Sequence, residues 1–475
     1  MVFSSYAFIF VFLPITLAGF VVLRRFCGTA ACKWWLVGAS LVFYAQGSLS
    51  FVPLLAGTVV VNYLLIQAIG RMEQRGLAAK VVLGVSVAEN LGLLFYFKYL
   101  NFFLDTVNRA AGTDFVLHKI ILPIGISFYT FQILACAIDV FRRESKVESF
   151  LDFAAFVTFF PQLIVGPIIR YNAMAPQLGD GLGRPTAERV MLGALLFSIG
   201  CAKKIIIADP LIGHAQDFYA TFAEKSMAGF FEGWSGVLAY TFAYYFDFSG
   251  YIDMALGLGL FFNITLPQNF NSPYKARNFA DFWRRWNITV SQFFNDYIFR
   301  RIFRFGNRIP KLILATFVTF LVSGVWHGVG WNFIFWGLAN GALVCAANIM
   351  TLRRKSLPFP LAWSLTFFFV LLVRVLFDCN GMTQAMTVYK TILDIRPLFS
   401  DAGAFFAQGL QFVQKNTMTC LLIVAGAGIC FFAPNTGEVS KNFSPRWYYA
   451  AFAGVLLTIS GFFMREVSNF LYFQF

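Results

Sequence analysis

The longest uncharged segment of the chain constrains its fold more than any other feature. Residues 312–352 contain no Asp, Glu, Lys or Arg, and His327, one of only 3 histidines in 475 residues, lies within this run. Ionisable side chains are costly inside a bilayer and usually have a function there. The sequence therefore predicts that the His327 imidazole lies near mid-bilayer depth and has a function there. The alternative is a packing histidine that bonds a neighbouring backbone carbonyl.

The composition is that of a membrane protein. Hydrophobic residues make up 59% of the chain and charged residues only 13%, against about 25% charged in soluble proteins. Apolar stretches recur along the sequence, and a spanning helix needs about 20 such residues. We expect an all-α polytopic membrane protein with about 11 to 13 membrane-embedded helices, the shorter ones re-entrant or interfacial.

The connections between these stretches leave no room for a soluble domain, and no internal repeat is visible. We therefore expect one integral membrane domain over residues 1–475. The first apolar run is followed by Arg24 and Arg25 rather than by a cleavage site, which predicts a retained anchor and not a removable signal peptide. The 8 cysteines are scattered and form no C-x-x-C, so we expect them to pack in the interior, with no disulfide framework and no metal site.

Half of the net charge of +14 lies in one short segment. Residues 275–311 hold nine bases against Asp281 and Asp296, a net charge of +7. Such a segment is expected on the cytoplasmic side. Within it, apolar residues recur every three or four positions over residues 279–297, which predicts an amphipathic helix in the membrane interface, with Asn287 at the edge of its apolar face. Charge alone favours lipid headgroups over a specific ligand as the partner of its basic side.

Two other constellations have structural readings. Asp247 and Asp253 are six residues apart in an apolar stretch, so they do not share a helix face, and we expect each to bind a separate structural partner. Pro161 and Pro167 interrupt the apolar residues 160–167, which predicts a broken helix that turns back and lines an enclosed cavity.

Several motifs together resemble a known family. They are residues 281–287 (Asp-Phe-Trp-Arg-Arg-Trp-Asn), 296–298 (Asp-Tyr-Ile) and 324–328 (Gly-Val-Trp-His-Gly), supported by residues 1–5, 122–129, 160–167, 245–250, 269–274 and 471–475. In this order and over nearly the whole chain, they resemble the membrane-bound O-acyltransferase (MBOAT) family, in particular its bacterial alginate O-acetyltransferase branch.

The resemblance implies a roughly toroidal MBOAT-type helical bundle, in which a cytoplasmic and an outer funnel meet at His327. It implies an O-acyltransferase of the bacterial inner membrane, with acetyl-CoA as the expected donor, no permanently bound cofactor and no nucleic acid partner. The acetyl group is expected to cross the membrane to an extracytoplasmic acetyltransferase partner, for O-acetylation of an exopolysaccharide such as alginate. Peptidoglycan or another cell-envelope glycan is the alternative acceptor, and D-alanine transfer to teichoic acid is a weaker candidate.

The resemblance also assigns two catalytic residues, His327 and Asn287. Asn287 stands where we expect a histidine in this branch, and of the branch's next loop only residues 306–308 (Gly-Asn-Arg) match. Transfer to a hydroxyl needs a base, and an imidazole in an apolar run, where burial disfavours its charged form, suits that task. Asn287 is expected to orient this base or to donate to the developing oxyanion.

No Gly-x-Ser-x-Gly motif occurs, so direct attack by the acceptor is favoured over an acyl-enzyme. The expected binding residues for the coenzyme A phosphates and arm are Trp283, Arg284, Arg285 and Trp286. The other histidines, His118 and His214, are expected in loops without a catalytic role. A transporter, or a scaffold of a polysaccharide-export complex, is the competing class, although transporters commonly show repeated halves.

Overall fold

The computed structural model describes residues 2–73, 76–179, 181–225, 229–303, 309–464 and 470–471. The chain is 80% helical, and no strand occurs in these ranges. This confirms the predicted all-α class. The chain divides into two compact units, one of Met1–Gly200, Tyr251–Gln268 and Phe443–Asn469, the other of Cys201–Gly250, Asn269–Asn442 and Phe470–Phe475. The single domain expected from the sequence stays a prediction.

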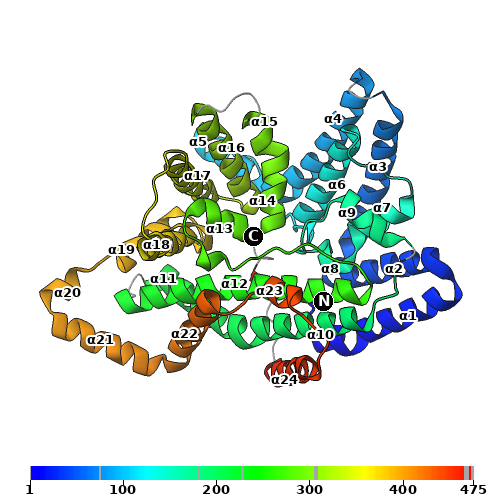
Figure 1. Cartoon of the computed structure of the whole chain (residues 1–475). Helices are drawn as coiled ribbons and strands as arrows, with labels where there is room; N and C mark the ends of the chain where they lie inside the picture. Colours follow the sequence, from blue (N-terminus) through cyan, green and yellow to red (C-terminus); the bar gives the residue numbers. More distant parts are fainter. Residues whose placement is uncertain are drawn as a thin grey trace. The chain divides into compact units, whose positions relative to one another are not determined.

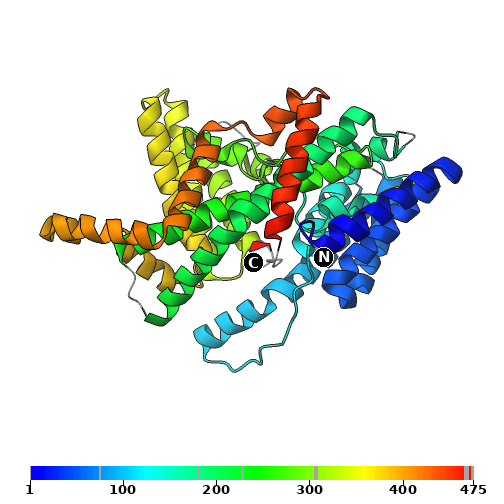
Figure 2. The ribbon, with the colours of Figure 1, turned by 90° about the horizontal axis from the view of Figure 1, so that it is seen from below.

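The first unit begins with a helical hairpin, α1 and α2, drawn in dark blue in Figure 2. Helices α3, α4 and α6 pack against one another beside it (Figure 1). Helix α7 ends at Thr158, and the short α8 follows after a break at Phe159, which confirms the predicted broken helix. The bounds in this unit are α1 Leu13–Phe26, α2 Gly28–Ser48, α3 Val52–Arg71, α4 Leu77–Leu94, α5 Leu100–Ala111, α6 Ile126–Phe141, α7 Phe150–Thr158, α8 Phe160–Leu163, α9 Tyr171–Met174 and α24 Trp447–Phe463.

Helices α10 (Ala187–Ala202) and α12 (Phe230–Phe261) contribute to both units. The remaining helices of the second unit are α11 Asp209–Lys225, α13 Phe279–Arg285, α14 Ile288–Phe294, α15 Arg300–Phe303, α16 Ile309–His327, α17 Trp331–Leu352, α18 Phe359–Asp378, α19 Met382–Ile392, α20 Arg396–Ser400, α21 Ala402–Lys415, α22 Thr417–Phe432 and α23 Thr436–Lys441. Helices α21 and α22 meet at an angle of 91°, visible as the orange bend in Figure 1.

Helices α16 and α17 make the closest helix pair of the second unit (Figure 1). Their backbones meet at two glycines. A Cβ on Gly324 would lie 2.4 Å from the carbonyl oxygen of Phe333, and a Cβ on Gly337 would lie 2.4 Å from that of Phe320. Small residues let membrane helices approach this closely, so the pair fixes α17 against the end of α16 that carries His327.

Asp247 has the structural partners that its burial in an apolar stretch requires. Its carboxylate lies 2.6 Å from Nζ of Lys204 and accepts the backbone N–H of Leu471 at 2.9 Å. Asp209 also pairs with Lys204, at 2.8 Å. Buried charges persist when they are paired and hydrogen-bonded, so the structural reading of Asp247 is confirmed. Six of the 8 cysteines are buried and all are free, as packing residues would be.

Within the described residues, seven helical segments are long and apolar enough to cross a membrane. The bent pair α21 and α22 would make an eighth if it counts as one span. Two shorter apolar helices, α6 and α24, add to these. The chain is therefore a multi-pass membrane protein. The spans are Phe8–Phe26, Leu49–Arg71, Leu77–Ala111, Ala187–Ala220, Ile309–His327, Trp331–Leu352 and Phe359–Asp378.

Candidate functional site

One cavity of the second unit gathers most of the residues that the sequence singled out. Its volume is about 780 Å³, and it is lined by α13, α14, α16, α17 and the π-helical turn Asn295–Phe299. His327, Asn287, Trp283 and Arg284 all contribute to its wall. Small-molecule sites commonly measure about 300–1,000 Å³, so this cavity is large enough for a substrate.

The backbone at Asn287 shapes one wall of this cavity. Asn287 has φ 42° and ψ 57° and separates α13, which ends at Arg285, from α14, which begins at Ile288. The predicted amphipathic helix over residues 279–297 is therefore wrong as one element. Left-handed backbone angles are costly for most side chains, and asparagine is among the few that accept them.

The side chain of Asn287 faces the cavity without a partner. It is 2% exposed, and neither its Oδ1 nor its Nδ2 has a hydrogen bond within the described part of the protein. A buried amide left unbonded costs about 1–3 kcal/mol. Such an amide is available to a bound ligand, as both donor and acceptor.

The turn that carries Asn287 is held by a residue that sequence reasoning missed. Asn269, fully buried, accepts the backbone N–H of Thr289 on its Oδ1 at 2.9 Å and the Thr289 hydroxyl at 2.7 Å. Its backbone carbonyl accepts the N–H of Ile288 at 2.9 Å. A distant side chain thus satisfies the first orphan donors of α14, a task that the preceding residue usually performs. Residues 269–274 stood out in the sequence only as a family motif.

His327 is the last residue of α16, with α17 beginning at Trp331. The uncharged run is therefore two helices, and the imidazole lies at the end of one rather than in the middle of a single helix. The ring is 6% exposed and lies edge-on to Trp326, Trp336 and Phe377, with centroid distances of 4.7, 5.1 and 5.5 Å. Three aromatic rings thus restrict its orientation. Its depth in the bilayer stays a prediction.

Helix α16 presents a polar row to the cavity ahead of His327. Thr316, Thr319 and Ser323 all line the cavity, three or four residues apart, with His327 four residues further on. The two threonine hydroxyls donate back to the carbonyls of Leu312 and Ala315, so their oxygens remain available as acceptors. Across it lie the amide side chains Asn348, Gln292 and Asn295. The wall is therefore rich in neutral hydrogen-bonding groups.

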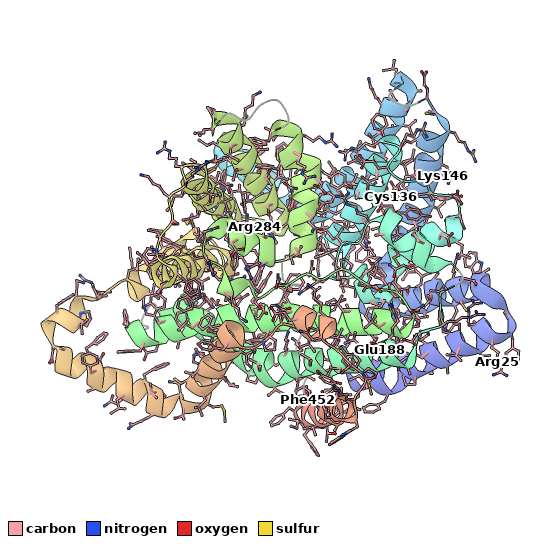
Figure 3. The ribbon with its side chains drawn as sticks, viewed as in Figure 1. Arg25, Cys136, Lys146, Glu188, Arg284 and Phe452 are labelled. Carbon is pink, nitrogen blue, oxygen red and sulfur yellow. The ribbon has the colours of Figure 1, made fainter. Side chains whose placement is uncertain are left out.

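The four expected donor-binding residues separate into two pairs. Trp283 and Arg284 line the cavity, and Arg284, labelled in Figure 3, has a side chain 68% exposed. Arg285 and Trp286 are absent from the described lining. Arg285 instead pairs with Asp281 at 3.0 Å, and its NH1 donates to the carbonyl of Asn271 at 3.3 Å.

Trp286 is 6% exposed inside an aromatic cluster, stacked on Tyr244 at 6.0 Å and on Phe282 at 5.6 Å.

The other two histidines, His118 and His214, lie in different kinds of structure. His118 lies in an exposed loop, as predicted. His214 lies in helix α11, where its Nε2 is 3.1 Å from Oγ of Ser235, so its predicted loop position is wrong. Its neighbouring acids Asp209 and Asp217, which suggested a loop, belong to the same helix. The Gly-Asn-Arg match at residues 306–308 lies outside the described residues.

Comparisons with known proteins agree with this architecture. The sequence model of the membrane-bound O-acyltransferase family matches residues 82–384, which include His327 and Asn287. A peptidoglycan O-acetyltransferase of Helicobacter pylori is 36% identical in a match that covers 100% of this chain and 98% of the relative. A probable alginate O-acetylase AlgI of Pseudomonas aeruginosa is 37% identical, covering 82% of this chain and 75% of the relative.

A teichoic acid D-alanyltransferase of Bacillus subtilis is 31% identical over 49% of this chain and 60% of the relative. The family match extends over more than half of the sequence, and the first two relatives cover most of it at more than 30% identity. This chain therefore belongs to the membrane-bound O-acyltransferase family and is an O-acyltransferase.

Proposed function

We propose that this protein transfers an acetyl group from acetyl-CoA, at a site formed by His327 and Asn287, for O-acetylation of a cell-envelope glycan. One observation carries the proposal. The buried imidazole and an unpartnered buried amide line the same cavity. A base and a preorganised donor are the two groups that acyl transfer from a thioester to a hydroxyl requires.

In this mechanism the acceptor hydroxyl attacks the thioester carbonyl while His327 takes its proton. A C–O bond forms, and the carbonyl oxygen becomes an oxyanion that accepts a hydrogen bond from Nδ2 of Asn287. Collapse of this intermediate breaks the C–S bond, and the imidazolium returns the proton to the departing thiolate. His327 thus ends the cycle as it began, and no acyl group is left on the chain.

The cavity wall has groups that suit the coenzyme A arm. That arm carries amides, and the hydroxyl and amide side chains of α14, α16 and α17 supply neutral hydrogen-bond partners along the cavity. Among the described residues of the cavity wall, Arg284 is the one with a permanent positive charge, and guanidinium groups bind phosphate through charge-assisted hydrogen bonds. We propose that Arg284 holds a phosphate of the donor on the cytoplasmic side of a bacterial inner membrane.

The acceptor is a glycan in our proposal, reached through an extracytoplasmic acetyltransferase partner. The end-to-end match to a peptidoglycan O-acetyltransferase favours peptidoglycan, since the alginate relative is matched over only 75% of its length. An exopolysaccharide such as alginate is the second candidate, supported by its similar identity of 37%.

The test uses the purified protein in nanodiscs, with radiolabelled acetyl-CoA and with membranes and walls of the deletion strain, which supply both the extracytoplasmic partner and the acceptor. Release of coenzyme A by the unaltered protein and its loss in His327→Ala would support the proposal. Base-labile acetate should disappear from the peptidoglycan of a deletion strain and return with the intact gene. Its disappearance from a secreted polysaccharide alone would move the acceptor to the second candidate, and unchanged acetate in every glycan would contradict the proposal.

A further inference from the structure

A polar cluster lies between α3 and α4 in the first unit. Its centre is Asn62, which is fully buried. The Nδ2 of Asn62 donates to the carbonyl of Thr58 at 3.0 Å and to Oε2 of Glu89 at 2.9 Å. Its Oδ1 accepts the Ser86 hydroxyl at 3.0 Å and Nδ2 of Asn90 at 2.7 Å. The amide of Asn62 is therefore fully used in holding its neighbours in place.

Glu89 is a carboxylate without a cation. It lies within the candidate span Leu77–Ala111, and Asn62, its hydrogen-bond partner, lies within Leu49–Arg71. Among the described residues, no Lys, Arg or His comes within ion-pair distance of it. A carboxylate inside a membrane is costly, and such groups almost always pair or mark an ion or proton site.

Other oxygens of the cluster also lack a hydrogen-bond partner. Asn90 is 1% exposed and uses its Nδ2 on Asn62 and on the Ser86 carbonyl, but its Oδ1 has no hydrogen bond. The hydroxyls of Thr58 and Tyr129, both buried, are unpartnered as well. Tyr129 belongs to α6, which packs against both α3 and α4, and it lies within electrostatic range of Glu89. The cluster thus holds one amide oxygen and two hydroxyls for which the described residues supply no partner, and their lone pairs are open to a cation.

We propose that Glu89, Asn90 and the neighbouring hydroxyls bind a monovalent alkali cation of the size of Na⁺. Hard cations take oxygen ligands from carboxylates, amides and hydroxyls. A single positive charge balances the single carboxylate, whereas a divalent ion would leave an uncompensated charge in the membrane. A proton on Glu89 would satisfy one acceptor and leave Oδ1 of Asn90 unbonded. This site is independent of acyl transfer, and it would clamp α3, α4 and α6 together.

The experiment measures binding of ²²Na⁺ by the full-length protein in detergent micelles, together with its thermal unfolding in NaCl and in choline chloride of equal concentration. We expect saturable binding of one Na⁺ per chain and a higher Tm in NaCl, because a ligand that binds only the folded state stabilises it. In Glu89→Gln, binding should fall by about tenfold or more, since a neutral amide replaces the charged ligand. Gln can still accept the Asn62 hydrogen bond, so the helices should stay packed.

The matched control is Glu148→Gln. Glu148 also belongs to the first unit, but its side chain is 71% exposed and pairs with Lys146, labelled in Figure 3. Binding of ²²Na⁺ and the Tm difference between the two salts should survive this change. Loss of both in the control would point to a nonspecific effect of charge and overturn the site.

Two further outcomes would overturn it. Equal Tm values in the two salts, with no saturable ²²Na⁺ binding by the unaltered protein, would refute the proposal without any variant. If Glu89→Gln is as stable as the unaltered protein, and the Tm of neither protein depends on Na⁺, the Glu89 carboxyl is protonated and the proposal is refuted.

Discussion

The indole N–H of Trp283 donates a 3.1 Å hydrogen bond to Oδ1 of Asn340, which ties the cavity wall on α13 to the interior of α17. Asn340 in turn donates to the carbonyl of Trp336 at 2.8 Å, and the ring of Trp336 contacts His327. The orientation of the imidazole therefore depends on residues of two helices that need not react with the substrate themselves.

Trp283→Phe removes this hydrogen bond while it keeps an aromatic ring in the cavity wall. We expect kcat to fall by about tenfold, since a net loss of about 1–1.5 kcal/mol in positioning corresponds to that factor. The control is Trp363→Phe, because Trp363 also donates its indole N–H, in this case to the backbone carbonyl of Tyr274 at 2.9 Å. Trp363 does not line the cavity in the described structure, so equal losses of kcat in both variants would refute the positioning role.

His327→Ala should lower acetyl transfer by about 10²-fold or more, because the acceptor hydroxyl loses its base. Membrane insertion and thermal stability should change little. His118→Ala, in an exposed loop, and His214→Ala, in α11, are the controls and should keep their activity. Near-normal coenzyme A release by His327→Ala would remove it from the mechanism, and the pH–rate profile of the unaltered enzyme should show one essential base.

Position 287 allows the backbone and the amide to be tested separately. Asn287→Gly keeps the left-handed conformation at no steric cost, so it should retain stability and lose about 10²-fold in kcat, the scale of one lost oxyanion donor. Asn287→Ala should lose the same activity and be about 1–2 kcal/mol less stable than Asn287→Gly, because glycine has no Cβ to oppose a positive φ.

Asn287→Asp should fold but be nearly inactive, since a carboxylate would oppose the developing oxyanion. Full activity in Asn287→Gly, measured at saturating donor, would exclude a role for the amide.

The neighbouring arginines provide a matched pair. Arg284→Glu should raise KM for the donor by about tenfold or more with the protein level unchanged, because Arg284 lines the cavity. Arg285→Glu should leave KM near its original value and lower the Tm, since Arg285 holds Asp281 and the carbonyl of Asn271. Equal effects of the two changes on KM would favour a diffuse attraction to lipid or donor over a specific phosphate contact.

Gly324→Ala should destabilise the protein by about 1–3 kcal/mol, the usual cost of overpacking, and should reduce kcat because α16 ends at His327. Thermal unfolding in detergent measures the first effect and coenzyme A release the second. Gly428→Ala on α22 is the control, because a Cβ there meets nothing within 4 Å. If Gly324→Ala keeps the Tm and the rate of coenzyme A release of the unaltered protein, α16 and α17 can move apart without loss of stability or activity.

The membrane class could be predicted because it depends on long apolar runs, which are visible in the sequence without knowledge of their partners. The catalytic role of His327 stays a prediction. The course of residues 279–297 could not be predicted. Phe279, Phe282 and Phe294 keep helical spacing in the sequence although they belong to two helices. A single residue with positive φ changes the direction of the chain without changing this spacing. The turn at Asn287 is bonded by Asn269, which lies 20 residues before Thr289 in the sequence and meets it only in the folded protein.

The same limit applies to the polar residues. Arg284 and Arg285 are adjacent and chemically alike, so a count of charges treats them as one patch. In the described structure Arg284 lines the cavity, whereas Arg285 pairs with Asp281. His214 was expected in a loop because acids surround it, but those acids belong to the same helix, where Asp209 pairs with Lys204. Helix geometry and side-chain pairing, which charge counting does not describe, decide these placements.

The left-handed turn at position 287 also restricts which mutations a lineage can accept there. Asparagine, aspartate and histidine are the side chains most often found with positive φ, besides glycine. The codons of asparagine and histidine differ by one nucleotide, so the exchange needs one point mutation and no rebuilding of the backbone. A protein with this turn can thus gain or lose a second titratable group beside His327 in a single evolutionary step, while its helices stay where they are.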